Sequence, residues 1–472
     1  MPTPVITIAQ MREWERATWA TGVSEESVMR QAGAAVAKVV LRRSRPGAAV
    51  LVLAGKGHNG DDARFAAEGL LGRSVRIVNV TDPAAAVAEV KCFSGALIVD
   101  GLLGIGLSRP LADDWLRLVA ALNDSRVPIL AVDVPSGLDA DTGEPLGDAV
   151  RATVTVTFGV MKQGLLRATA APFTGRLEVA ADIGLVPCPF ESELNWTLPE
   201  DFAGFPPPRP VDGHKGTFGH LAIFAGSLGY HGAAVLAARG ALRAMPGLVS
   251  VFTTERAYPA VAAQLAQPMV HPWMAGVKLP ASCSAVLFGP GLAGPDVPER
   301  LRSDLAGLWS ESPLPVVADA SALAWLPTGR TPPDAVRVVT PHPGEAAGML
   351  GRTTVEVLAD RGRAVREISR SRGGGWVVLK GRHTLVGRAE GDLFLNSSGN
   401  PQLGQGGSGD VLAGYLAGAL AQPLLRADLG LVVRQAVWAH GHAADVLSDR
   451  QGVWMMMDLV DALGNTARVG FT

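Results

Sequence analysis

Short apolar runs rich in β-branched residues recur along the first half of the chain, each bounded by Gly, Asp or Pro. They are Ala49 to Ala54, Val75 to Val80, Ala96 to Asp100, Ile129 to Val134 and Thr153 to Phe158. Runs of this kind predict buried strands, whereas the Ala- and Leu-rich stretches between them, such as 63–71 and 113–122, have the length of helices. Strands that alternate with helices are typical of βαβ units on a mostly parallel sheet. The first half is therefore expected to have an α/β fold.

The same pattern restarts after the segment Phe-Pro-Pro-Pro-Arg-Pro at 205–210. Because such a run continues neither a helix nor a central strand, we place a boundary there and expect domains at 1–205 and 212–472. Further strands are expected at Leu221 to Ala225, Leu248 to Thr253, Ala285 to Phe288, Val316 to Ala318, Val336 to Val339 and Trp376 to Leu379. Helices are expected at 233–244 and 410–421. No repeat of 20–50 residues links the halves, so the two α/β domains differ.

The length, charge and cysteine content of the chain exclude several classes of protein. A chain of 472 residues with 48% hydrophobic and 18% charged residues is long enough for two domains and is not disordered. A net charge of −2 gives no basic field for nucleic acid. Three isolated cysteines argue against a disulfide framework or structural zinc, and no apolar run reaches the roughly 18 residues of a membrane span. We expect a cytoplasmic homo-oligomer with no nucleic-acid or membrane partner.

A glycine-rich segment follows the first predicted strand directly and reads Gly-Lys-Gly-His-Asn-Gly-Asp-Asp at 55–62. Such a turn between strand and helix exposes backbone N–H groups and a helix N-terminus, which suit phosphate. A tight turn with Asp61 or Asp62 as helix N-cap is the structural alternative. Both interpretations place the segment at the carboxyl end of a strand.

Two further strand ends carry oxygen ligands beside glycines, at 100–106 and 133–137. Ligands of parallel sheets lie beyond the carboxyl ends of strands, so we expect these segments to converge with the glycine-rich loop. Asn59, Asp100 and Ser136 offer one carboxylate among neutral oxygens, which suits potassium better than magnesium. Asp133 is a candidate acid or base if burial raises its pKa. Capping of the following turn is the alternative role for each aspartate.

The second half carries Gly406, Gly407, Ser408, Gly409 and Asp410 directly before an apolar helix. Backbone N–H groups of this segment predict an anion hole, and the aspartate is placed to take a proton from a hydroxyl that attacks a phosphoryl group. A flexible glycine linker is the alternative. Upstream, Thr-Pro-His-Pro-Gly-Glu at 340–345 follows one strand, while Lys380 and Thr384 follow another as candidate phosphate and hydroxyl contacts.

Residues 1–200 resemble the NAD(P)H-hydrate epimerase family, on the evidence of Thr7 to Glu13, Val28 to Gly33, the glycine-rich loop and both aspartate segments. The chain departs from that family's usual Asn-Asn-Gly-Gly-Asp-Gly at His58, Asp61 and Ala63. The resemblance implies a Rossmann-like α/β sandwich in which potassium is held by Asn59, Asp100 and Ser136. It also implies a binding site for the nicotinamide hydrate made of His58, Asn59, Gly60, Asp61, Asp62, Gly104, Ile105, Gly106, Leu107, Ser108, Arg109, Pro110 and Asp133.

Residues 212–472 resemble the NAD(P)H-hydrate dehydratase family, a branch of the ribokinase-like α/β fold, on the 340–345, 380–384 and 406–410 segments. One departure is Met-Pro-Gly at 245–247, where the family usually has Gly-Ala-Gly. The resemblance implies Asp410 as catalytic base, Mg²⁺ as cofactor and ADP as co-substrate, with ATP left open. Implied contacts to the hydrate are Ala233, Gly291, His342 and Asp410, and implied contacts to the nucleotide are Lys380, Gly381, Arg382, His383, Thr384 and Gly409.

The two resemblances together predict a bifunctional enzyme that repairs hydrated NADH and NADPH. The first domain would interconvert the R and S hydrates, and the second would dehydrate the S hydrate with ADP, giving AMP and phosphate. The alternative is a ribokinase-like kinase for a small vitamin precursor with a non-catalytic N-terminal binding domain. A stable phosphorylated product would favour that alternative.

Overall fold

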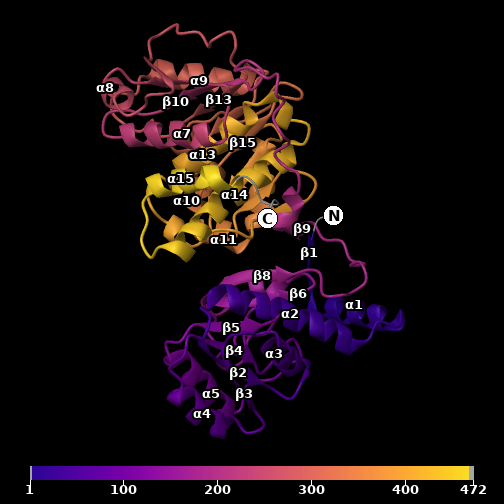
Figure 1. Ribbon diagram of the computed structural model, residues 1–472. Coiled ribbons are helices and arrows are strands. Elements are labelled where there is room, and N and C mark those ends of the chain that lie inside the picture. Colours follow the sequence, from indigo (N-terminus) through magenta and orange to yellow (C-terminus); the bar gives the residue numbers. More distant parts are fainter. Residues whose placement is uncertain (1–2, 467–472) are drawn as a thin grey trace. The chain divides into compact units, whose positions relative to one another are not determined.

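The chain divides between Ser192 and Glu193 into an N-terminal and a C-terminal unit in the computed structural model, which describes residues 3–466 (Figure 1). The division lies before the proline-rich segment at which the sequence analysis placed it. Strand β9 (Leu194–Trp196) pairs with β18 (Leu393–Leu395), and the ring of Phe202 packs 5.5 Å from that of Trp438. Residues 193–205, assigned above to the first domain, therefore belong to the C-terminal unit.

The N-terminal unit contains a six-stranded parallel sheet in the order β3-β2-β4-β5-β6-β8. Its strands are β2 (Ala49–Ala54), β3 (Ser74–Asn79), β4 (Leu97–Gly101), β5 (Ile129–Val132), β6 (Val154–Phe158) and β8 (Arg176–Ala180). Outside this sheet, β1 (Thr3–Ile6) pairs in parallel with β7 (Met161–Lys162). The helical segments are α1 (Ile8–Ala20), α2 (Glu25–Arg43), α3 (His58–Glu68), α4 (Pro83–Cys92), α5 (Asp113–Asp124), η1 (Gln163–Leu166) and α6 (Ala171–Thr174).

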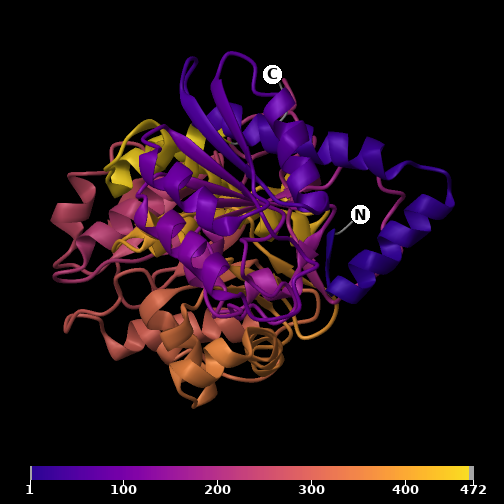
Figure 2. The same ribbon diagram turned by 90° about the horizontal axis from the view of Figure 1, so that it is seen from below.

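Alternation of side chains along β2 builds a core on each face of this sheet. Val50 and Val52 pack with the apolar faces of α2 and α3, whereas Leu51 and Leu53 pack with α4 and α5. Figure 2 shows the strands lying between helices. Because both faces are covered, the strands are apolar throughout, as the runs in the sequence predicted.

The chain order of the strands reverses between β2 and β4. From β2 the chain crosses to β3 on one side and then returns to β4 on the other, so the loops after β2 and β4 diverge. Open α/β sheets bind ligands in the crevice at such a switch point, outside the carboxyl ends of the strands. The topology therefore opens a crevice beside the glycine-rich segment at 55–62.

The C-terminal unit is built on a second sheet in the order β12-β11-β10-β13-β14-β15-β16-β17-β18-β9. Its remaining strands are β10 (His220–Phe224), β11 (Leu248–Thr253), β12 (Met269–Pro272), β13 (Ala285–Phe288), β14 (Val316–Ala318), β15 (Arg337–Val339), β16 (Trp376–Leu379) and β17 (Leu385–Gly387). The strands are parallel from β12 to β16, and β17 pairs antiparallel with both neighbours. The order reverses between β10 and β13, which again opens a crevice at the carboxyl ends.

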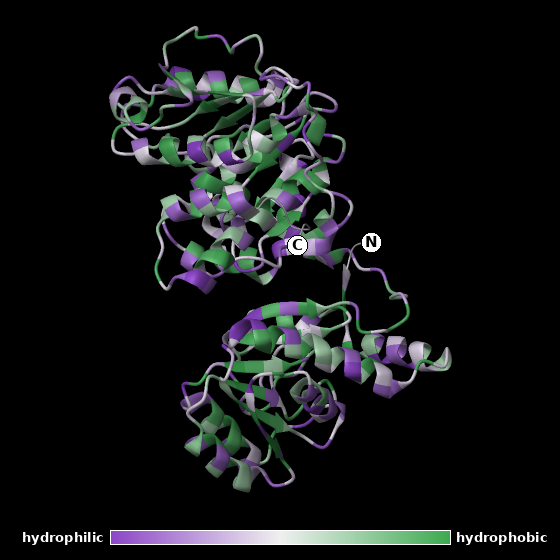
Figure 3. Cartoon of the chain, in the orientation of Figure 1, coloured by the Kyte–Doolittle hydropathy of each residue, from purple (hydrophilic) through white to green (hydrophobic). Residues whose placement is uncertain are grey.

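Helices cover this second sheet. They are α7 (His231–Arg243), α8 (Tyr258–Ala262), α9 (Glu299–Glu311), α10 (Pro343–Leu350), α11 (Thr354–Ala359), α12 (Arg361–Ser371), α13 (Ser408–Leu420), α14 (Leu429–Arg450) and α15 (Met456–Thr466), with 3₁₀ turns η2 (Pro199–Phe202), η3 (Ala320–Ala324), η4 (Pro401–Leu403) and η5 (Pro423–Leu425). The hydropathy colouring of Figure 3 places the strands of both units among the most hydrophobic segments. Of the helices in residues 3–466, none is long and apolar enough to cross a membrane.

Helices α7 and α13 pack backbone to backbone, which fixes the start of α13. A Cβ atom added at Gly414 would lie 1.9 Å from the carbonyl oxygen of Ala237, and one at Gly240 would lie 2.4 Å from that of Val411. Larger residues would separate the two helices, because buried helix contacts tolerate little change of volume. The glycines thereby set the position of the first turn of α13, which carries Asp410.

The corrected boundary predicts that a C-terminal fragment of residues 193–472 is more stable than one of residues 212–472. The shorter fragment lacks β9 and the buried rings of Trp196 and Phe202, and removal of one buried aromatic ring costs about 3–5 kcal/mol. Urea unfolding of both fragments measures the difference. N-terminal fragments that end at 192 and at 205 are the matched control and should unfold alike. Equal stability of the two C-terminal fragments would contradict the assignment of 193–205 to this unit.

Candidate functional site

The glycine-rich loop of the N-terminal unit turns tightly between β2 and α3. Helix α3 begins at His58, and its N-cap is Gly57 with no side-chain hydrogen bond, so neither Asp61 nor Asp62 caps it. A Cβ atom at Gly60 would lie 2.1 Å from the carbonyl oxygen of Gly55. The loop therefore folds onto itself, and this close approach requires glycine.

A pocket of about 650 Å³ lies at the switch point, beside this loop. The predicted hydrate-binding residues that line it are His58, Asn59, Asp62, Gly104, Ile105, Gly106, Leu107, Ser108, Arg109 and Asp133. Gly60 is buried in the loop, Pro110 is exposed, and Asp61 accepts a hydrogen bond from Arg64 Nη1 at 2.7 Å. Helix α1 adds Met11, Arg12 and Glu15 to the lining, residues that the sequence analysis did not select.

Asp133 lies in the wall of this pocket and is held by a buried lysine. Its Oδ1 accepts hydrogen bonds from Lys162 Nζ at 2.6 Å, Thr157 Oγ1 at 3.0 Å and the Phe158 backbone N–H at 3.1 Å. Lys162 is fully buried and also donates to Thr157 Oγ1 and the Phe158 carbonyl. Asp133 and Lys162 therefore form a buried ion pair in the wall of the pocket. Asp133 has a φ of 60°, a conformation that aspartate adopts more readily than most residues.

Two more carboxyl groups line the same pocket. Asp62 is 7% exposed, and its Oδ1 has no hydrogen-bond partner in the described part of the chain. Burial raises the pKa of Asp62 to about 8, and the negative charges of Asp133, Asp61 and Glu15 act in the same direction against Lys162. Burial and Asp133 also raise the pKa of Glu15. The pocket therefore combines one carboxylate that is paired with an ammonium group and two carboxyl groups whose pKa values are raised.

The three predicted potassium ligands lie next to one another at the ends of β2, β4 and β5. Asp100 is fully buried and accepts from the Ser136 hydroxyl at 2.6 Å and from the Ser136 backbone N–H at 2.9 Å. Asn59 donates to the carbonyl of Leu103 at 3.1 Å, and Ser136 Oγ lies 3.2 Å from that same oxygen. Asp100 also accepts from the Leu102 backbone N–H at 3.3 Å, so it caps the following turn as well.

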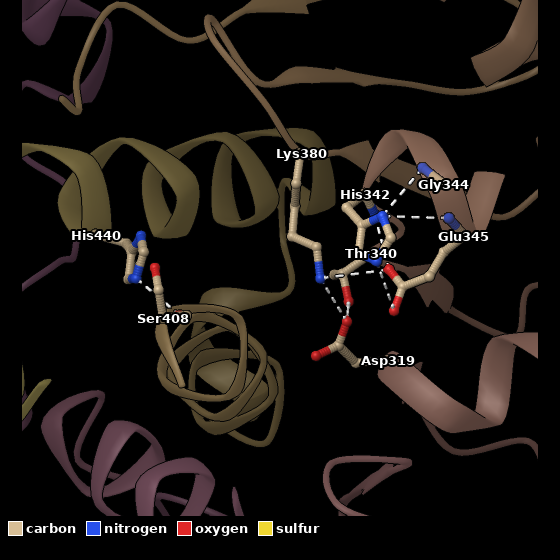
Figure 4. Close-up of polar contacts among 8 residues, drawn as sticks. All are labelled: Asp319, Thr340, His342, Gly344, Glu345, Lys380, Ser408 and His440. Carbon is tan, nitrogen blue, oxygen red and sulfur yellow. Dashed lines mark hydrogen bonds and ion pairs between the residues drawn. The ribbon is translucent and has the colours of Figure 1, made fainter. Parts of the chain in front are cut away.

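The C-terminal unit places its second set of polar residues at the start of α13. Ser408 is the first residue of the helix, and Gly407 before it has a φ of 97°, so the glycine-rich segment is an ordered helix N-terminus rather than a linker. Nε2 of the buried His440 lies 3.0 Å from the Ser408 carbonyl, as Figure 4 shows. A carbonyl only accepts, so Nε2 carries the proton. Burial lowers the pKa of His440 to about 4, which keeps the ring neutral.

Three strand ends and α13 bring a charged network together (Figure 4). Asp319, directly after β14, accepts from Thr340 Oγ1 at 2.6 Å and from Lys380 Nζ at 2.9 Å, and Lys380 Nζ lies 3.8 Å from Glu345. Burial raises the pKa of Asp410 to about 7; Asp319 and Glu345 add to the shift and Lys380 opposes it. Asp410 therefore changes protonation near neutral pH, which suits a general base.

The predicted nucleotide and substrate contacts lie around this network. Lys380 Nζ is 3.2 Å from where a Cβ atom of Gly409 would lie, so lysine and helix N-terminus are adjacent. Burial acts to lower the pKa of Lys380, but the carboxylates of Asp319, Glu345 and Asp410 outweigh it and raise that pKa. The 380–384 loop is held by Arg361, which donates to the carbonyls of Leu379, Arg382 and His383.

Three predicted ligand contacts have structural partners of their own. The His383 ring packs edge-on 5.0 Å from Trp196, and Thr384 donates to the Gly381 carbonyl. Burial, with Arg382 and Arg361, lowers the pKa of His383 to about 3. His342 caps α10 by accepting from the backbone N–H groups of Gly344 and Glu345. A Cβ atom at Gly291 would lie 2.9 Å from that of Ala233, so these two predicted hydrate contacts are neighbours.

Sequence reasoning missed Glu15, Lys162 and Asp319. Asp319 directly follows a strand that the sequence analysis identified, so its position alone was a usable signal. Lys162 and Glu15 stand in unremarkable segments, and only the tertiary structure brings them to Asp133.

Comparison with known proteins identifies the class. The C-terminal unit has the fold of a ribokinase-like superfamily protein from Enterococcus faecalis, with a TM-score of 0.51 at 24% identity over 59% of this chain and 96% of that one. A second similar structure is an ADP/ATP-dependent NAD(P)H-hydrate dehydratase from Bacillus subtilis co-crystallised with ATP/Mg²⁺, at 30% identity over 55% of this chain and 92% of that one, with a TM-score of 0.49. The protein is thus a two-domain α/β protein with a ribokinase-like C-terminal unit, as expected.

Sequence families then identify the protein more closely. The NAD(P)H-hydrate dehydratase family matches residues 221–465, and the YjeF-related protein N-terminus family matches 25–91 and 80–164. Bifunctional NAD(P)H-hydrate repair enzymes from Coxiella burnetii and Gloeobacter violaceus are 34% and 36% identical, each over 94% of both chains. The chain belongs to the family of bifunctional NAD(P)H-hydrate repair enzymes, which confirms the resemblance found in the sequence.

The buried pair in the N-terminal unit predicts a specific loss of stability. Lys162→Met should lower the free energy of unfolding of this unit by about 3–5 kcal/mol, because it leaves the Asp133 carboxylate buried without its counter-ion. Denaturant unfolding measures the loss. Adding Asp133→Asn should recover part of it, since asparagine removes the charge and accepts the backbone conformation. Lys91→Met on the exposed surface of α4 is the control; an equal loss in both lysine variants would contradict the prediction.

Proposed function

We propose that this protein repairs hydrated NADH and NADPH: the N-terminal unit interconverts the R and S hydrates, and the C-terminal unit dehydrates the S hydrate with ADP. The observation that carries the proposal is the location of Asp410, at the first turn of α13 beside the Asp319–Lys380 pair. The independent pocket around Asp133 supports a second reaction on the same chain. Family membership favours repair over the alternative of a vitamin-precursor kinase.

The chemistry of the substrate explains the need for a nucleotide. Hydroxide leaves poorly, so transfer of a phosphoryl group to the ring hydroxyl turns the elimination into loss of phosphate. Asp410 takes the hydroxyl proton as the oxygen attacks the β-phosphoryl group of ADP, and AMP departs. The N–H groups of Gly406 to Gly409 stabilise the developing phosphoryl charge. The phosphate then leaves with its bonding electrons while the ring nitrogen supplies electrons, and loss of the neighbouring C–H proton restores NADH or NADPH.

The network at the strand ends also fits Mg²⁺. Asp319, Glu345 and Asp410 present three carboxyl groups to one ammonium group, and Asp319 Oδ2 is buried with no hydrogen-bond partner in the described residues. Carboxylate oxygens are the ligands that Mg²⁺ prefers. We propose that Asp319 and Glu345 hold the ion, which would neutralise charge on the nucleotide phosphates.

Asp410→Asn should abolish nucleotide-dependent dehydration and leave epimerisation intact. Loss of a general base lowers the rate by roughly 10²–10⁴-fold. Dehydration is measured as the absorbance of the reduced nicotinamide that appears after pure S hydrate and ADP are added. Epimerisation is measured in the absence of ADP, by separating the R and S hydrates. Glu390→Gln, which removes an exposed carboxylate of the same unit, is the control. Near-native dehydration by the Asp410 variant would refute its role as base.

For the N-terminal unit we propose potassium as the cation near Asn59, Asp100 and Ser136. The donor set supports this proposal: one buried carboxylate is combined with amide, hydroxyl and carbonyl oxygens, which suits a weakly hydrated monovalent ion. Burial raises the pKa of Asp100, against the hydrogen bonds from Ser136 and Leu102. A nearby cation would stabilise the ionised carboxylate.

Asp100→Ala should weaken epimerisation and remove its dependence on potassium, while dehydration of pure S hydrate stays unchanged. Titration of potassium against the rate of interconversion tests this in both proteins. Asp114→Ala, at an exposed ion pair on α5, is the matched control. If Asp100 only caps the turn, the variant loses stability but its residual rate of interconversion depends on potassium as before. That result would contradict the assignment of Asp100 as a potassium ligand.

A further inference from the structure

The pocket of the N-terminal unit contains a carboxyl group that the fold buries without a partner. Asp62 is 7% exposed, lines the pocket, and its Oδ1 forms no hydrogen bond with the described residues. Burial of an unpaired polar atom is costly unless a ligand or a protonated form compensates for it. Asp62 belongs to α3, which begins within the glycine-rich segment at 55–62. The helix therefore holds Asp62 at the wall of the pocket.

The surroundings of Asp62 differ sharply from those of Asp133. The charged groups that act on the pKa of Asp62 are Asp133 after β5, Asp61 on its own helix, Glu15 on α1 and Lys162 on β7. The pocket is also lined by Arg12, Lys56, His58 and Arg109. Lys162 donates to Asp133 at 2.6 Å, and its two other hydrogen bonds go to Thr157 Oγ1 and the Phe158 carbonyl. Asp133 therefore has a buried counter-ion, whereas the pKa of Asp62, at about 8, leaves its carboxyl group mainly protonated at neutral pH. A carboxylate paired with an ammonium group and a protonated carboxyl group in the same pocket can accept and donate protons as an acid–base pair.

We propose that Asp62 is the proton donor and Asp133 the proton acceptor that epimerise the hydrate by opening and reclosing its ring. The inference rests on the proposed function of the N-terminal unit and assigns roles within it. Lys162 is a positioning residue: it holds the Asp133 carboxylate through the 2.6 Å ion pair and does not itself line the pocket. The sequence had implied only that Asp62 contacts the hydrate.

The reaction balances with these two groups alone. Hydration places the hydroxyl on the carbon bonded to the ring nitrogen, because the nitrogen directs the proton to the farther carbon of the double bond. Asp133 takes the hydroxyl proton, the O–H electrons form a C=O bond, and the C–N bond breaks with its electrons on nitrogen. Asp62 gives its proton to that nitrogen. The result is an open-chain aldehyde and an N–H group, with Asp133 protonated and Asp62 ionised.

Reclosure returns both groups to their starting states. Rotation about the bond next to the aldehyde exposes the opposite face of the carbonyl carbon. The nitrogen attacks that face while Asp62 takes back the N–H proton and Asp133 returns its proton to the oxygen. No oxidant, metal or further reactant is consumed, and the hydroxyl oxygen of the substrate is retained throughout.

Asp62→Asn tests the proposal in the full chain. Asparagine matches the shape and neutrality of the protonated acid, so the variant should fold, but it has no acidic proton to transfer. Pure R hydrate is incubated without ADP, and the S hydrate that forms is separated and measured. We expect the rate above the uncatalysed background to fall roughly 10²–10⁴-fold with little change in KM. Glu68→Gln, on the exposed side of α3, is the matched control and should be unaffected.

Two further readouts separate catalysis from a structural role. The wild-type rate should decline as pH rises through about 8, where Asp62 loses its proton, and the residual rate of Asp62→Asn should lack this decline. Substrate labelled with ¹⁸O in the ring hydroxyl should keep its label in the product epimer. Both proteins should dehydrate S hydrate with ADP equally, which shows that the chain is folded.

The outcomes are distinct. If the wild-type protein does not interconvert the hydrates, the proposed function of this unit fails. If it does and Asp62→Asn interconverts them at the wild-type rate, or retains the decline near pH 8, the role of Asp62 fails. Replacement of ¹⁸O by solvent oxygen at every turnover would overturn the ring-opening step, because the oxygen would then leave as water.

Discussion

One ammonium group set against several buried carboxyl groups organises each site. In the N-terminal unit Lys162 pairs with Asp133 at 2.6 Å, and in the C-terminal unit Lys380 pairs with Asp319 at 2.9 Å. A buried carboxylate with a counter-ion stays charged, whereas one beside it without a counter-ion tends to take up a proton. Burial is the main cause of the raised pKa of Asp62, about 8, and of Asp410, about 7, and neighbouring carboxylates add to both shifts. The lysines therefore decide which carboxyl group in each site has a counter-ion and which is left with a raised pKa.

The topology makes this arrangement attainable. Parallel strands end at a common edge, so residues distant in sequence meet there without long loops: Asp319, Thr340 and Lys380 follow β14, β15 and β16. The cost of burying their charges is offset by bonds among them, since Thr340 and Lys380 both donate to Asp319. A site of this kind needs a covered sheet, because exposure to water would screen the charges and remove the pKa shifts.

The sequence predicted the fold well because strands covered on both faces are apolar throughout. The bounds of β2, β11, β13, β14 and β16 agree with the expected runs to the residue. The domain boundary was misplaced because a proline-rich segment signals the end of regular structure but not which core the preceding residues join. Leu194 to Trp196 form too short a strand to stand out, and their pairing with β18 connects segments almost 200 residues apart.

Only part of each candidate site could be predicted from the sequence. Glycine-rich loops and aspartates at strand ends carry local signals, and these found Asp62, Asp133 and Asp410. The partners of Asp62 and Asp133 carry none: Lys162 is one buried lysine among many apolar positions, and Glu15 lies on a helix whose exposed side is also charged. Electrostatic coupling depends on distances across the fold, which spacing along the chain does not encode.

The departures from the family's glycine-rich loop are accommodated by their neighbours. Ala63 stands where the family has glycine, and its Cβ fits because the facing residue is Gly101, at which a Cβ atom would lie 2.3 Å away. Asp61 brings an additional negative charge, but its carboxylate accepts from Arg64, which also donates to the carbonyl of Gly55. The charge of Asp61 is thus paired with Arg64, and the same arginine links α3 to the glycine-rich loop. His58 is largely exposed at the pocket mouth, 3.7 Å from Glu25, so all three substitutions leave the glycine contacts of the loop in place.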